Sequence, residues 1–218
     1  MINHIDQNDF AESALARSNI YGLLAIIYRE EPSKDLIKEI KSAQFENALS
    51  NLGVHFGEGF ARQPEEKLLE TLAIEFARLF IGPGQHISPH ESVHLEGGKD
   101  GALWGDATVK VQQFIESTGL SHKCEYRGLP DHISVELEFM QIVSKEAAQR
   151  WKKNDYYGSE NCLKIEQKFL KEHLSKWVPF FCNKVIKKTQ LTIYRETAIF
   201  TKNFIKFACS TPMFVPPA

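Results

Sequence analysis

The sequence contains no long hydrophobic run. Its longest apolar stretch extends from Tyr21 to Tyr28, far short of the roughly 20 residues that a helix needs to cross a bilayer. Residues 1–6 lack the basic and apolar segments of a secretory signal. Disorder and fibrous repeats are also excluded, because 43% of the residues are hydrophobic and 25% are charged. We therefore expect a globular cytoplasmic protein that folds as a single domain over residues 1–218.

Common catalytic and cofactor motifs are missing as well. The four cysteines (Cys124, Cys162, Cys182 and Cys209) show no C-x-x-C spacing, so we expect buried thiols rather than a zinc or redox site. The glycine pairs at 82–84 and 97–98 lack the Lys-Ser/Thr of a phosphate loop. No G-x-S-x-G motif occurs either. The sequence therefore predicts no catalytic residue and no bound cofactor.

The small net charge of −2 hides an uneven distribution. Residues 1–140 contain 12 basic and 22 acidic side chains, whereas residues 141–218 contain 14 basic and 6 acidic ones. The lysines of the second part recur at helical spacing, which is typical of a solvated helix face rather than a nucleic-acid footprint. The acidic excess of the first part favours a cationic ligand or peptide.

Apolar residues recur at helical spacing through most of the chain, and no segment alternates with the period of a strand. Capping residues, prolines and glycines divide this pattern: Ser33 can cap one helix, and Gly119 can close another. The fold class is therefore all-α, a bundle of roughly nine or ten helices. The helices are expected at about 9–31, 34–40, 45–52, 64–81, 104–117, 130–143, 160–177, 179–188 and 192–209, with an irregular tail at 212–218.

Residues 81–101 form the one long segment without helical periodicity, and they contain five glycines, two prolines and three histidines. A loop of this length in a compact domain is usually functional or disordered. His86, His90 and His94 are spaced by four, a spacing that would align metal ligands on a helix. Pro89 argues against that helix.

A second cluster, Asp131, His132 and Glu136, lies at the start of a predicted helix. These residues suit a metal site, or alternatively an N-cap at Asp131 with a His132–Glu136 ion pair. One hypothesis is thus a small all-α metal-dependent enzyme that uses both clusters. The other is a groove that holds a peptide between aromatic-rich helices.

Four blocks of sequence resemble the TorD/DmsD family of redox-enzyme maturation chaperones. They are residues 75–83 continued by 89–93, residues 103–108, residues 130–140 and residues 173–180. The third block is the most specific, because it places proline, aspartate and histidine directly before a Glu-Leu-x-Phe-Met helix.

The resemblance implies a TorD-like, non-enzymatic chaperone that binds the twin-arginine signal peptide of a molybdopterin oxidoreductase precursor. It would hold the precursor, and sometimes its folded part, in the cytoplasm until the cofactor is inserted and Tat export begins. No nucleic acid, metal or stable membrane insertion is implied. The chaperone would be a monomer or a domain-swapped dimer.

The resemblance also implies a set of peptide-binding residues: Asp131, His132, Phe76, Leu79, Phe80, Pro89 and Ser92. Two guanidinium groups need carboxylates, which Asp131 could supply, with Glu75 and Glu91 as weaker candidates. A Phe/Leu stripe at helical spacing is equally typical of a core. His90 and His94 stand where the family usually has tyrosine or tryptophan.

Overall fold

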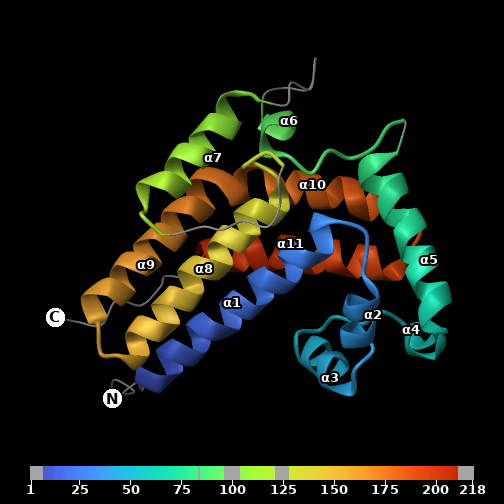
Figure 1. Cartoon of the computed structure of the whole chain (residues 1–218), viewed down its shortest axis with the longest axis horizontal. Helices are drawn as coiled ribbons and strands as arrows, with labels where there is room; N and C mark the ends of the chain where they lie inside the picture. The colour runs from blue at the N-terminus through green and yellow to red at the C-terminus, as the bar shows by residue number, and fades with distance from the viewer. Residues whose placement is uncertain (1–6, 83, 96–103, 121–127, 211–218) are drawn as a thin grey trace.

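The computed structural model describes residues 7–82, 84–95, 104–120 and 128–210 (Figure 1). Helices are the regular structure of this part of the chain, whose one isolated β-bridge joins His90 to His132. The all-α prediction is confirmed. None of the helices in these ranges has the length and hydrophobicity to cross a membrane. The predictions for Cys124 and for the tail at 212–218 lie outside the described residues.

The regular elements of the described ranges are helices and two π-helical turns. In chain order they are α1 (Gln7–Arg29), α2 (Lys34–Ile40), α3 (Ala43–Asn51), α4 (Glu58–Arg62), α5 (Glu65–Phe76), the π-helical turn η1 (Ala77–Ile81), α6 (Glu91–Leu95), α7 (Asp106–Ser117), α8 (Ile133–Lys152), α9 (Tyr156–Phe169), the π-helical turn η2 (Leu170–Leu174), α10 (Ser175–Lys188) and α11 (Thr192–Ser210).

The centre of the fold is the pair α1 and α8, which lie side by side along their length (Figure 1). Gly22 permits this close approach, since a Cβ there would lie 2.5 Å from Nε2 of Gln141. Buried aromatic and aliphatic side chains fill the space between α1, α8, α10 and α11. Arg29 of α1 donates to Glu138 of α8 at 2.9 Å and ties the two helices at the margin of this core.

Several helix ends lie where the sequence signals place them. Ser33 caps α2, because its hydroxyl accepts a hydrogen bond from Leu36 N at 3.1 Å. Gly119 follows α7 with a φ of +66°, a conformation that glycine adopts without strain. The prediction of Asp131 as the N-cap of α8 is wrong. His132 is the cap, since its Nδ1 accepts from Ser134 N at 3.1 Å.

The predicted break between helices at Pro179 is also wrong. The change of helical register occurs earlier, at η2, and α10 continues through Pro179 to Lys188. Pro179 is therefore an internal residue of α10, since the residue before this helix, Leu174, is itself helical.

Candidate functional site

The long loop before α6 lies against the N-terminus of α8. Ile133 N donates to Pro89 O at 2.8 Å, and Glu91 N donates to Asp131 O at 3.0 Å. The carboxylate of Asp131 accepts from Ser92 N at 3.0 Å. These bonds bring together four of the predicted site residues, Pro89, Ser92, Asp131 and His132, from segments about 40 positions apart in the sequence.

Asp131 lies beneath this junction with none of its surface exposed. Its Oδ2 holds Ser92 N, but its Oδ1 has no hydrogen-bond partner, and neither does the Ser92 hydroxyl. Buried polar atoms are nearly always paired, so an unpaired carboxylate oxygen calls for a specific explanation. The site can accept a hydrogen-bond donor that is absent from the isolated chain.

Two further buried carboxyl groups lie behind Asp131. Glu91 pairs with His173, whose Nδ1 is 3.0 Å from Oε2. Glu136 accepts from Trp177 Nε1 at 3.3 Å. Burial and the neighbouring Glu91 and Asp131 raise the pKa of Glu136 well above its usual range. A protonated Glu136 can donate a hydrogen bond to Glu91, so that Oε1 of Glu136, which is otherwise unpaired, gains a partner.

Three histidines of the site have lowered pKa values. Burial, and after it the neighbouring His90 and Arg29, lower the pKa of His132 to about 3. Burial also lowers the pKa of His90 and of His94. The rings of His90 and His132 meet edge to face, with centroids 5.0 Å apart.

The metal-enzyme hypothesis is not supported. The described ranges, which include both histidine and carboxylate clusters, contain no group of three or more His, Cys, Asp or Glu side chains placed to hold a metal ion. Ring nitrogens of these histidines are already engaged: His94 Nε2 with Ser88 O at 2.8 Å and His132 Nδ1 with Ser134. Asp131, His132 and Glu136 are buried, so they do not form a surface ion pair either.

Phe76, Leu79 and Phe80 lie in the core, with 3%, 0% and 7% of their surface exposed. The ring of Phe80 packs against Phe76 and against Phe181 of α10. Leu79 fixes the loop through its carbonyl oxygen, which accepts from Ile87 N at 2.7 Å. Their role in peptide binding therefore stays a prediction, and Phe80 has the best access to a ligand.

That access comes from a surface groove of about 760 Å³ between the loop and α10. Its lining consists of Phe80, residues 85–90, Val93, His94 and the lysines 184, 187 and 188. Its volume is typical of ligand pockets. Two smaller hollows, of about 310 and 390 Å³, lie among α2–α4 and between α1 and α11, and neither contains a predicted site residue.

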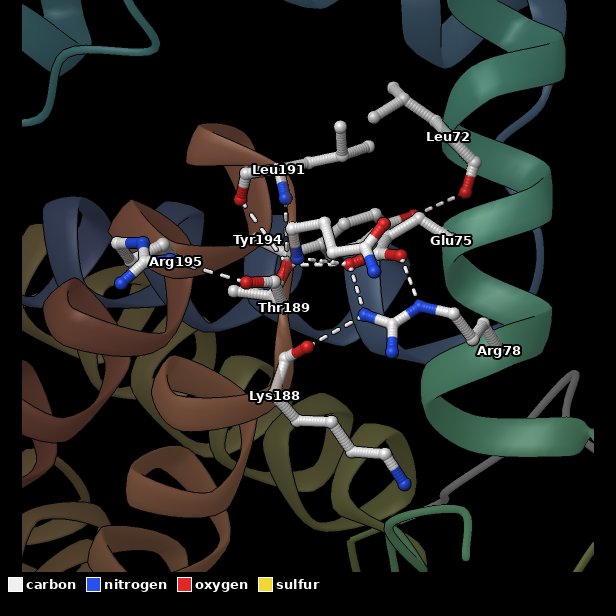
Figure 2. Close-up of polar contacts among 9 residues, drawn as sticks. Leu72, Glu75, Arg78, Lys188, Thr189, Leu191, Tyr194 and Arg195 are labelled. Atoms are coloured by element: carbon white, nitrogen blue, oxygen red, sulfur yellow. Dashed lines mark hydrogen bonds and ion pairs between the residues drawn. The ribbon is translucent and has the colours of Figure 1, made fainter. Parts of the chain in front are cut away.

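An ion pair between the buried Glu75 and the partly exposed Arg78 lies next to Lys188, a residue of the groove wall (Figure 2). Glu75 accepts from Arg78 Nε and Nη2 at 2.7 and 2.8 Å, from Thr189 Oγ1 at 2.8 Å and from Gln190 N at 2.7 Å. Arg78 also donates to Lys188 O at 2.7 Å. The network thus joins α5 and η1 to the corner between α10 and α11.

These contacts decide the role of Glu75. Burial alone would raise its pKa, but the hydrogen bonds from Arg78, Gln190 and Thr189 outweigh burial and lower the pKa. Both carboxylate oxygens are occupied within the chain, so Glu75 is not available to a ligand arginine.

We expect Glu75→Gln to lower the free energy of unfolding by about 1–3 kcal/mol, because it removes the charge that Arg78 and two further donors share. Urea denaturation followed by circular dichroism measures this change. Asp35→Asn is the matched control, since Asp35 forms an exposed pair with Lys38 at 3.9 Å, for which we expect less than about 1 kcal/mol. Equal effects of the two variants would contradict a structural role for the network.

Sequence reasoning missed three features of this site. The spacing of three between Glu75 and Arg78 is compatible with an ion pair on a helix, but the sequence does not indicate that the loop at 188–190 completes the network. His173 and Trp177 lie in a recognised block, yet their buried carboxyl partners depend on the fold. The lysines of α10 were interpreted only as part of a solvated face.

Comparison with known proteins gives consistent results. A family model described as nitrate reductase delta subunit matches residues 38–183. The chain is 31% identical over 164 residues to the chaperone protein TorD of Psychrobacter sp. (strain PRwf-1), covering 72% of this chain and 66% of that relative. It is 24% identical over 188 residues to TorD of Shewanella piezotolerans, covering 79% and 80%.

Among solved structures, one from Archaeoglobus fulgidus, described as a redox enzyme maturation protein, aligns with a TM-score of 0.53. The alignment covers 87% of this chain and 93% of the other at 20% identity, which supports the fold alone. With the family model covering most of the chain and the fold in agreement, this chain belongs to the TorD/DmsD family of redox-enzyme maturation chaperones, the family of the nitrate reductase delta subunit.

Proposed function

We propose that this protein is a cytoplasmic, non-enzymatic chaperone that binds the twin-arginine leader of a molybdopterin oxidoreductase precursor. It holds the precursor until the cofactor has been inserted and then releases it for Tat export. The names of the relatives, chaperone protein TorD, support the chaperone role. The leader is the ligand that the sequence blocks imply.

The observation that carries this proposal is the unpaired oxygen of Asp131. Glu75 is occupied by Arg78, and Glu91 is paired with His173. Among the three candidate carboxylates, Glu75, Glu91 and Asp131, it is Asp131 that has an oxygen without a hydrogen-bond partner, which can accept from a ligand. A guanidinium group matches it, since its planar N–H donors pair with a carboxylate in fixed geometry.

The burial of Asp131 sets a condition on binding. A leader arginine reaches Oδ1 only when the segment with Pro89 and Ser92 shifts away from the N-terminus of α8, at the cost of the bond from Ser92 N. The groove beside this segment presents Phe80, Ile87, Pro89 and Val93, which suit the apolar stretch of a leader.

Asp131→Asn tests the proposal. Asparagine keeps an oxygen for Ser92 N but has no charge, so the thermal midpoint should change by at most a degree or two. Binding of a twin-arginine leader peptide should weaken by about 1.5–3 kcal/mol, the range for hydrogen bonds to charged groups. This corresponds to roughly 10- to 150-fold in Kd, measured by isothermal calorimetry.

A twin-lysine version of the same peptide is the ligand control, because lysine does not reproduce the arginine fork. Asp35→Asn, at an exposed position of α2, is the protein control for the loss of one negative charge. If Asp131→Asn binds the twin-arginine peptide as tightly as the unmodified protein, Asp131 is not a recognition residue.

A further inference from the structure

The groove has a basic wall. Lys184, Lys187 and Lys188 of α10 line it, and no carboxylate belongs to the described lining. Within the described part of the chain, no ion pair involves any of the three lysines. Burial lowers the pKa of His90 and of His94, so these two side chains do not add positive charge at neutral pH. The groove therefore attracts anionic groups and repels arginine.

One of these lysines is oriented by a histidine. Nε2 of His94 lies 2.8 Å from Ser88 O, so this nitrogen carries the proton and donates it to the carbonyl. Nδ1 is then an acceptor, and Lys184 Nζ lies 3.4 Å from it. The imidazole ring is itself fixed by stacking on Trp177, with centroids 5.4 Å apart. Lys184 is thereby held against His94 in the wall of the groove.

A second explanation applies to the other two lysines. Lys187 and Lys188 lie in the last turn of α10, where cations also offset the helix dipole. Lys184 precedes that turn, and the dipole does not account for its contact with His94. Lys184 is therefore the lysine whose position indicates a ligand-binding role, because compensation of the helix dipole does not explain it.

We propose that the groove selects a peptide segment of the client in which a carboxylate side chain is next to apolar residues, with Lys184 as the residue that binds the carboxylate. This proposal rests on the proposed function and adds to it a rule of specificity. Asp131 binds the arginine pair of the leader, and the lysines of the basic wall bind an acidic residue near that pair. His94 is a positioning residue for Lys184.

The test uses three synthetic twin-arginine leader peptides, identical except that one residue after the arginine pair is aspartate, asparagine or lysine. Calorimetry should rank their affinities for the unmodified protein as aspartate, asparagine, lysine, with about tenfold between the first and the last. Lys184→Glu should reverse the order. His94→Phe, which keeps the stacking on Trp177 but not the acceptor, should reduce the difference between the peptides.

Lys176→Glu is the matched control, because Lys176 is an exposed lysine of the same helix that does not line the groove. It should leave the ranking unchanged, and an equal effect of the two variants would overturn the proposal. Equal binding of the three peptides would overturn the specificity rule while leaving leader binding intact. Absence of binding by all three would overturn the proposed function as well. Displacement of the aspartate peptide by ATP would assign the lysines to a phosphate ligand instead.

Discussion

Glu91→Ala is expected to lower the free energy of unfolding by about 1–3 kcal/mol, the usual cost of leaving a buried hydrogen-bonding group without its partner. Glu91 and His173 expose 2% and 5% of their surfaces, and they join α6 to η2 at a distance of 3.0 Å. Alanine leaves His173 without this partner, and the aromatic rings of Phe114 and Phe169 that pack against it cannot replace it. Urea denaturation with linear extrapolation measures the change.

The control is an exposed pair of similar geometry. Glu160 and Lys164 on α9 are 2.7 Å apart, and Lys164 is largely exposed, so Glu160→Ala should cost less than about 1 kcal/mol. The double variant Glu91→Leu/His173→Phe should recover part of the loss, since apolar side chains of similar size replace both polar partners. A loss below about 1 kcal/mol for Glu91→Ala alone would show that the buried pair contributes little to stability.

The fold was predictable where local sequence signals decide the structure. α11 spans Thr192–Ser210, against an expected 192–209, because its apolar residues recur without interruption. Ser33 begins α2, because its side chain caps the helix, and Gly119 follows the end of α7, because glycine adopts the positive φ found there. Pro179 misled the prediction, since α10 continues through it, and the register change occurs earlier, in η2, whose residues have no distinctive local signal.

The site was predictable only in part. The order of the sequence blocks identified Pro89, Ser92, Asp131 and His132, and the backbone bonds between the loop and α8 bring them together. Their burial was not predicted, because it depends on helices packed over them from the C-terminal part of the chain.

Partners far apart in the sequence explain the remaining errors. Glu75 is a carboxylate that sequence alone could assign to a ligand. In the fold, Arg78 and Thr189, which is 114 positions away, donate hydrogen bonds to its oxygens. A helix cap was one of the two alternatives for Asp131, but its carboxylate accepts from Ser92 N, and His132 caps α8. Contacts of this kind have no signature in a single sequence.

The cap residue His132 leads to the second large expected effect, a loss of stability in acid. Burial, His90 and Arg29 lower its pKa to about 3 in the folded state, whereas an unfolded histidine titrates near 6.5. Below pH about 6.5 the unfolded chain binds the proton and the folded chain does not, so stability falls as the pH decreases to about 3. At about 1.4 kcal/mol per pH unit, this one residue contributes a loss of about 4–5 kcal/mol over that interval.

His132→Asn should remove this dependence and keep the helix cap, because asparagine caps helices well and does not titrate. The comparison is urea denaturation of both proteins from pH 7 to pH 4, with exposed His55→Asn as the matched control. The buried Glu136 acts in the opposite direction, since its raised pKa makes the folded state bind the extra proton as acid is added. Its contribution is common to all three proteins, so the difference between them isolates His132. If His132→Asn loses stability in acid as steeply as the unmodified protein, His132 does not carry the acid sensitivity.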